Sequence, residues 1–126
     1  MKGEADMQRV LVIHNVVGLA LLLKGWLEPE FEVDHVTSAL AAKESILTYR
    51  PTLLIVQLGE QETGIMLVKF LRDNTGIKDL PTFYISGSIV GIGTAPDSLP
   101  ILGIPCDAQV FHDMIATVLK GAPATS

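Results

Sequence analysis

The sequence has a single cysteine, Cys106, among its 126 residues. One thiol excludes an internal disulfide and any metal cluster built from cysteines. We interpret Cys106 as a small, partly buried apolar residue, and the lack of disulfides fits a reducing compartment. Basic residues are also few, with 9 Lys and Arg against 14 Asp and Glu, and they form no cluster. The net charge of -5 therefore gives no indication of a nucleic-acid interface.

The sequence also lacks an apolar run long enough to cross a membrane. Residues 10–23 come nearest, but His14 and Asn15 interrupt them, and no signal-cleavage pattern follows. We interpret this run as a strand leading into a helix, in a cytoplasmic protein with no membrane partner. Hydrophobic residues make up 48% of the chain, enough for one compact core. We expect a single domain over residues 1–126, ordered at about 8–120, with a tail at 121–126.

Apolar runs with the character of strands alternate with segments of helical periodicity. The predicted strands are residues 9–14, 31–36, 53–58, 80–86 and 101–105. The predicted helices are residues 16–28, 39–49 after a Ser38 cap, 64–74, and 108–120 after an Asp107 cap, ended by Gly121. Residues 87–100 are rich in glycine and proline, and there we expect at most a short or distorted fourth helix.

This alternation predicts an α/β fold with a parallel sheet covered by helices on both faces. We expect a flavodoxin-like three-layer sandwich of five βα units, with the strand order 2-1-3-4-5. In that order the topological switch point lies at the carboxyl ends of the first and third strands. His14, Asn15 and Gln57 are therefore predicted to meet in one crevice.

From about Arg9 to Leu119 the chain resembles the receiver domains of response regulators, the CheY-like family. "RVLVIHN" stands where the family has a strand ending in two acids, and "RPTLLIVQL" where it has the strand ending in the phosphate-accepting aspartate. "LPTFYISG" is similar to the strand that ends in Thr or Ser, and "GIPCD" to the strand that ends in Lys-Pro. The apolar frame and the prolines agree with the family.

The resemblance implies that the phosphorylation pocket of this chain is degenerate. The two acids that hold a divalent cation correspond to His14 and Asn15, the aspartate to Gln57, and the lysine to Ile104, while Ser86 keeps the hydroxyl. Mg²⁺ prefers charged oxygen ligands, and an amide is not a nucleophile. We expect Gln57 to form hydrogen bonds with Asn15 and Ser86 instead.

We therefore expect a pseudo-receiver, without enzymatic activity or cofactor, that acts in two-component-type signal transduction through phosphorylation-independent protein–protein interaction. The partner is a signalling or output component, or a second copy of the chain. Two apolar segments are candidate interfaces: the outer side of the first helix, where charge is usual, and the segment 87–100. The candidate residues are Val17, Ala20, Leu21, Ile89, Val90 and Ile92. A buried helix edge and a disordered loop are the respective alternatives.

Two other functions fit this fold class. The first is a domain that binds a small molecule or nucleotide in the crevice formed by His14, Asn15, Gln57 and Ser86. The second is a weak metal-dependent enzyme using His14 with Glu60 or Glu62, for which the ligand spacing has no defined pattern. Gly91–Pro96, "GIGTAP", is similar to a glycine-rich phosphate loop but lacks a strand-to-helix frame.

Overall fold

The computed structural model describes residues 8–14, 17–28, 30–59, 63–77 and 79–124, and for residues 17–20 and 121–124 it describes the backbone alone. The strands in this part of the chain are β1 (Gln8–Ile13), β2 (Phe31–Val36), β3 (Leu53–Gln57), β4 (Thr82–Ser86), β5 (Ile92–Thr94) and β6 (Pro100–Gly103). The helices are α2 (Val17–Leu27), α3 (Ala39–Tyr49), α4 (Thr63–Thr75) and α5 (Ala108–Ala124).

The strands form one sheet in the order β2-β1-β3-β4-β6-β5. Neighbouring strands from β2 to β6 run parallel, and β5 runs antiparallel to β6 at the edge. The parallel part has the predicted order, with β6 in the fifth place. The predicted α/β fold of the flavodoxin-like type is confirmed.

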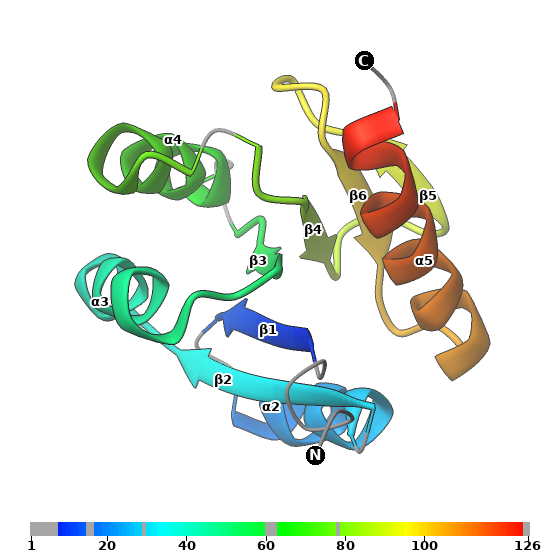
Figure 1. Ribbon diagram of the computed structural model, residues 1–126. Coiled ribbons are helices and arrows are strands. Elements are labelled where there is room, and N and C mark those ends of the chain that lie inside the picture. Colours follow the sequence, from blue (N-terminus) through cyan, green and yellow to red (C-terminus); the bar gives the residue numbers. More distant parts are fainter. Residues whose placement is uncertain (1–7, 15–16, 29, 60–62, 78, 125–126) are drawn as a thin grey trace.

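Helices cover both faces of the sheet, as Figure 1 shows. Side chains alternate between the two faces along each strand. Val12 is buried with Leu23 of α2 and Phe111 of α5. The next residue, Ile13, is buried on the other face with Val68 of α4 and the inner side of α3. The sheet is therefore the middle layer between the pair α2 and α5 and the pair α3 and α4.

The helix boundaries follow the expected capping chemistry at two places. Ser38 has an extended backbone, with φ of -137°, and its Oγ accepts a hydrogen bond of 3.1 Å from the Ala41 amide. Gly76 follows α4 with φ of +74°, a left-handed conformation that glycine adopts without strain.

The predicted stop at Gly121 is wrong, because α5 continues to Ala124. A single glycine costs a helix only about 1 kcal/mol, too little to end it.

Residues 87–100 contain no helix, within the prediction of at most a short one, but they contain an antiparallel strand that was not predicted. In the ladder between β5 and β6, Ile92 faces Leu102 and Thr94 faces Pro100. Each glycine costs a helix about 1 kcal/mol, and proline interrupts it. Pro100 is tolerated in β6 because it is the first residue of that strand. The segment "GIGTAP" accordingly lies in this edge hairpin and not at a turn from a strand into a helix.

The turn between β5 and β6 is closed by four hydrogen bonds. Two join backbone groups, from the Ala95 amide to the Leu99 carbonyl and from the Ser98 amide to the Ala95 carbonyl, both at 2.8 Å. The Asp97 carboxylate accepts the other two, from the Leu99 amide at 3.1 Å and from the buried Tyr84 hydroxyl at 2.5 Å. Tyr84 belongs to β4, so Asp97 ties the turn to the centre of the sheet.

Two apolar residues, one on α2 and one on α5, are exposed although each directly precedes a buried core residue. Leu22 is 44% exposed and Val110 36% exposed. Leu23 and Leu27 define the inner side of α2, and adjacent residues on a helix are rotated by about 100° from one another. Leu22 therefore points away from the sheet, and Val110 is displaced in the same way from Phe111 on α5.

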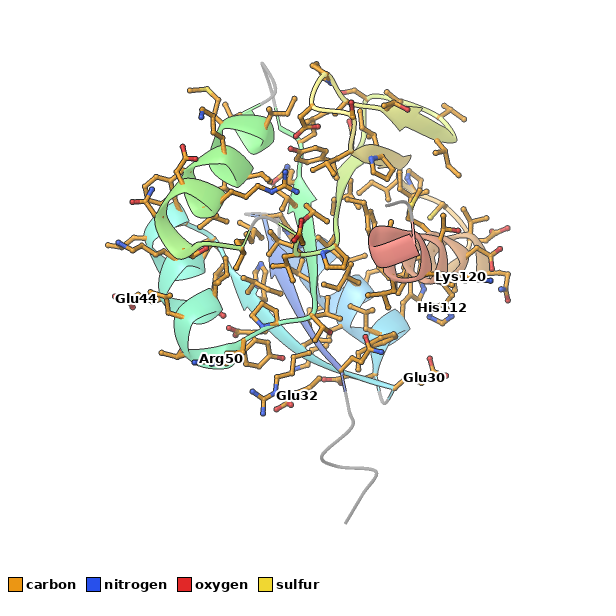
Figure 2. The ribbon with its side chains drawn as sticks, turned by 45° about the horizontal axis from the view of Figure 1, so that its top comes forward. Glu30, Glu32, Glu44, Arg50, His112 and Lys120 are labelled. Atoms are coloured by element: carbon orange, nitrogen blue, oxygen red, sulfur yellow. The ribbon has the colours of Figure 1, made fainter. Side chains whose placement is uncertain are left out.

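Charged side chains lie on the outside of the molecule, where Figure 2 labels Glu44, Arg50 and Lys120. The buried polar residues in the described part of the chain are His14, Ser45, Thr82 and Ser86. Across the same residues, every helix is too short or too polar to cross a lipid bilayer.

Candidate functional site

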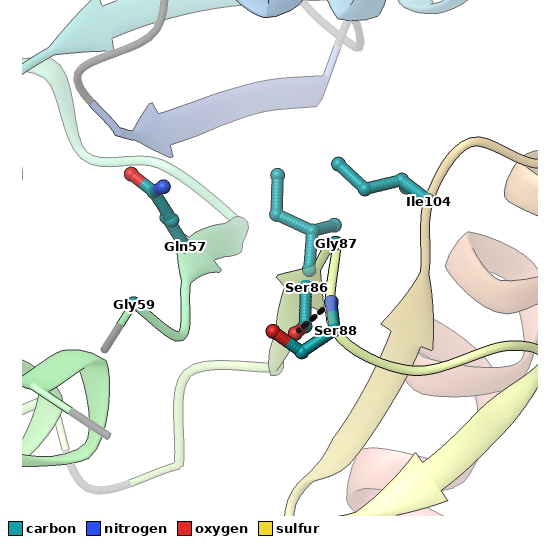
Figure 3. Close-up of a pocket in the computed structure, with 7 residues that line it drawn as sticks. Gln57, Gly59, Ser86, Gly87, Ser88 and Ile104 are labelled. Atoms are coloured by element: carbon teal, nitrogen blue, oxygen red, sulfur yellow. Dashed lines mark hydrogen bonds between the residues drawn. The ribbon is translucent and has the colours of Figure 1, made fainter. Parts of the chain in front are cut away.

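A pocket of about 170 Å³ opens at the carboxyl ends of β3 and β4, beside the residue that follows β6 (Figure 3). Its lining residues are Gln57, Gly59, Ile85, Ser86, Gly87, Ser88 and Ile104. Ligands of open parallel sheets usually bind at this edge. The structure thus brings together three of the predicted site residues, Gln57, Ser86 and Ile104.

Gln57 is placed by the buried strand β3, whose four preceding residues are all buried while Gln57 is half-buried. The chain then turns sharply into α4. The Gly64 amide donates to the Leu58 carbonyl at 2.7 Å, and a Cβ at Gly64 would lie 2.4 Å from the Gln57 carbonyl oxygen. Only glycine fits there, so Gly64 allows the start of α4 to pack against the end of β3.

The opposite wall is held by Ser86 and the residues around it. The Ser86 side chain is buried, and its Oγ accepts a hydrogen bond of 3.1 Å from the Ser88 amide, drawn in Figure 3. The Ile104 amide donates to the Ser86 carbonyl at 2.9 Å. In Figure 3 the Ile104 side chain extends toward the side of the pocket that holds Gln57. An aliphatic group therefore occupies the place that the family resemblance gives to a lysine.

Among the residues that the structure describes, those that line this pocket include no carboxylate, imidazole or cationic side chain. Its hydrogen-bonding side chains are the Gln57 amide and the hydroxyls of Ser86 and Ser88, all of them neutral. Among the described residues, no group of three or more His, Cys, Asp and Glu could hold a metal ion. Glu60 and Glu62, the predicted partners of His14 in a metal site, lie outside the described residues.

His14 does not line the pocket, although it follows β1 at the same edge of the sheet. Its side chain is 3% exposed, and its ring centroid lies 4.8 Å from that of His35. His35 Nε2 donates to the His14 carbonyl oxygen at 2.9 Å. Burial, together with the nearby His35, lowers the pKa of His14 to about 4. Asn15, the other residue predicted for the crevice, lies outside the described residues.

The candidate interface residues are divided between two elements. Leu21 of α2 is 68% exposed, Ile92 of β5 is 64% exposed, and Val90 is fully exposed. Ile89 is only partly buried and packs against the core on the α3 and α4 face. The side chains of Val17 and Ala20 lie outside the described part of the structure. Cys106 is half-buried against the other core, as predicted, and burial raises its pKa.

An apolar groove beside the pocket was missed in the sequence. Its volume is about 210 Å³, and its lining residues are Leu22, Trp26, Gly87, Ile104 and Pro105. Leu22, which is turned away from the sheet, and the aliphatic side chain of Ile104 both line the groove. The sequence contains both signals, in the pair Leu21-Leu22 and in "GIPCD", but only the fold shows that they are neighbours.

No model of a known protein family matches the sequence, and no curated protein matches it. Solved structures share its fold. The CheY-like receiver domain of a response regulator from Methylobacillus flagellatus is similar over 90% of this chain and 99% of that one, with 22% identity and a TM-score of 0.73.

Two further structures are similar at lower identity. The signal receiver domain of a modulated diguanylate cyclase from Desulfovibrio desulfuricans G20 matches 96% of this chain and 100% of its own, with 18% identity and a TM-score of 0.69. The anti-anti-sigma factor PhyR from Bartonella quintana matches 94% of this chain and 50% of its own, with 16% identity and a TM-score of 0.72. The chain therefore has the fold of receiver domains.

Proposed function

We propose that this protein is a receiver-like signalling domain that acts through protein–protein contacts and is not phosphorylated. The receiver fold supports a role in two-component-type signalling. The neutral pocket at the carboxyl edge of the sheet supports the absence of phosphoryl transfer. The partner is a signalling or output protein, or a second copy of the chain.

This proposal rests on the types of residue that line the pocket around Gln57. Phosphoryl transfer to a protein side chain needs a nucleophile, and it needs cations that neutralise the charge of the transferred group. Gln57 offers an uncharged amide where the nucleophile would stand, and Ile104 offers a hydrocarbon chain where a lysine would stand. A phosphoryl group in this pocket would have neither a carboxylate acceptor nor a counter-charge among the described lining residues, and no base among them activates the Ser86 or Ser88 hydroxyl.

The proposal is tested by incubating the protein with acetyl phosphate and Mg²⁺ and measuring its intact mass. The mass is expected to stay unchanged, while a catalytically intact receiver domain treated in parallel gains one phosphate. A phosphorylated form of this protein would refute the proposal.

The Gln57→Asp variant is the matched test of the pocket. It returns the carboxylate but leaves His14 at the cation-binding position and Ile104 at the lysine position. Because a carboxylate alone lacks the charge compensation that the reaction needs, the variant is also expected to keep its mass. Rapid phosphorylation of the variant would show that the rest of the phosphotransfer site is still functional, against the proposal.

A further inference from the structure

The neutral pocket and the apolar groove are adjacent cavities with a shared wall. Gly87 and Ile104 line both of them. On one side of this wall lie Gln57 and Ser86, and on the other lie Leu22 and Trp26. A molecule that passes over Gly87 therefore contacts a hydrogen-bonding surface at one end and a hydrocarbon surface at the other.

Size indicates that the two cavities are used together. Sites for small molecules usually have volumes of roughly 300–1,000 Å³. The pocket, at about 170 Å³, and the groove, at about 210 Å³, each fall short of this range, but together they reach it. An apolar cavity of about 150 Å³ can hold benzene, so the groove has room for one aromatic ring or one branched aliphatic group.

The lining residues define the charge of the ligand. Among the described lining residues, those of the groove are all apolar, and the polar side chains of the pocket donate and accept hydrogen bonds without carrying charge. Burying an ion without a counter-charge costs far more than burying a neutral amide that keeps its hydrogen bonds. The site therefore favours an uncharged head group over a carboxylate or a phosphate.

We propose that the joined cavities form one binding site for an uncharged amphiphilic small molecule, with an amide head group in the pocket and an aryl or branched alkyl group in the groove. Ile104 determines this specificity, because its side chain belongs to both cavities and excludes a cation from their junction. The site borders both candidate interfaces, since Leu22 lies on α2 and Gly87 begins the segment 87–100, but this proposal does not depend on the proposed function.

Trp26 provides a direct readout, because it is the protein's single tryptophan and lines the groove. Its indole packs against Phe111 with ring centroids 5.1 Å apart, so a ligand in the groove changes the surroundings of a partly buried ring. Titration with 4-phenylbutanamide is expected to give a saturable change in tryptophan fluorescence. The matched acid, 4-phenylbutanoate, is expected to bind roughly tenfold more weakly or not at all.

The Gly87→Leu variant tests whether the two cavities act together. Gly87 is exposed, and a Cβ there would lie 3.9 Å from the Ile104 carbonyl oxygen, an ordinary contact. The variant is therefore expected to fold and to lose the response to the amide. The control is Leu40→Ser, a change at an exposed residue of α3 that lines neither cavity, and it is expected to bind like the wild type.

The Ile104→Lys variant tests the proposal through an expected gain in affinity for the acid. An ammonium group at the junction is expected to reverse the preference, so that 4-phenylbutanoate binds roughly tenfold more tightly than to the wild type. Loss of folding cannot produce this gain. The proposal is overturned if the wild type gives no saturable response to the amide, if it binds the acid equally well, or if Gly87→Leu binds like the wild type.

Discussion

His14 shows how burial changes the chemistry of one residue. Its pKa is lowered to about 4, first because the ring is removed from solvent and second because His35 lies beside it. In the unfolded chain the same imidazole has a pKa near 6.5. The unfolded state therefore binds a proton more readily than the folded state, and protonation favours unfolding.

We predict that acid destabilises the protein through His14. The neutral His14 side chain contributes at most about 3 kcal/mol to the free energy of unfolding. This contribution is fully present above about pH 6.5 and decreases as the pH falls toward 4. Urea unfolding at a series of pH values between 7 and 4 measures it. The His14→Phe variant keeps a ring of similar size without a titratable group, so its stability should fall less over this range. An equally steep fall in the variant would contradict the prediction.

Single residues of the site were predictable from the sequence to different degrees. Gln57 and Ser86 were placed correctly at strand ends, because buried runs define where the strands end. The sequence did not indicate that His14 would lie outside the pocket lining, because that depends on the path of the chain just after β1. Leu22 and Leu23 both fit a helical period in the sequence, and only the position of the sheet shows which of them is buried.

At the scale of elements, one side-chain contact joins the turn between β5 and β6 to the centre of the sheet. Tyr84 is fully buried, and its hydroxyl donates to the Asp97 carboxylate in the turn. Burial, the hydrogen bond and the negative charge of Asp97 all raise the pKa of this phenol well above its usual range. The neutral phenol therefore keeps this hydrogen bond at all pH values near neutrality.

We predict that Tyr84→Phe destabilises the protein by about 1.5–3 kcal/mol, since a hydrogen bond to a charged group contributes roughly this much and the ring stays in place. Chemical denaturation measures the change, and amide exchange should show faster opening at β5 than in β1. A variant with unchanged stability and unchanged exchange at β5 would show that Asp97 does not hold the hairpin.

Tyr49→Phe is the control for this prediction. The Tyr49 hydroxyl is buried, and no hydrogen-bond partner is found for it within the described residues. Its ring lies under the Arg9 guanidinium at 5.5 Å, a contact that phenylalanine keeps. Removing this hydroxyl should leave the free energy of unfolding unchanged or increase it, because a buried polar group without a partner destabilises the folded state.

The elements themselves were predictable where local signals agree. Residues 31–36 form a strand with the predicted boundaries, and α3 begins after the predicted Ser38 cap, because β-branched residues and capping residues act locally. Residues 87–100 were not predictable in this way. Glycine and proline argue against a helix without specifying an alternative, and the hairpin is stabilised by Tyr84 from a strand that precedes it in the chain.

At the scale of the molecule, β5 is a short, exposed sheet edge without charged residues. Edge strands usually carry charges that prevent pairing with other chains. No charged residue occurs from Gly87 to Pro96, and Ile92 on β5 is 64% exposed. The other edge, β2, carries Glu32, which forms an ion pair of 3.3 Å with Arg9. β5 is therefore better suited than β2 to pair with a neutral, apolar edge of another chain.

We predict that copies of the chain associate through β5, and that Ile92→Glu raises the dissociation constant by roughly tenfold or more, because association would bury the new charge. Sedimentation at high protein concentration measures the average mass. Leu21→Glu makes the same change on α2 and tests the alternative surface. Leu40→Glu, at an exposed leucine of α3, should behave like the wild type. A monomeric wild type at several hundred micromolar would exclude this association.

At the antiparallel edge, the residues that pair are separated by only a few positions in the sequence. Thr94 pairs with Pro100 across one short turn, whereas Val10 pairs with Leu53 across two crossovers. The entropy lost on closing a loop grows with the length of the loop. Pairing of β5 with β6 therefore requires less ordering of the chain than any parallel pair in this sheet, and this edge lowers the contact order of the fold.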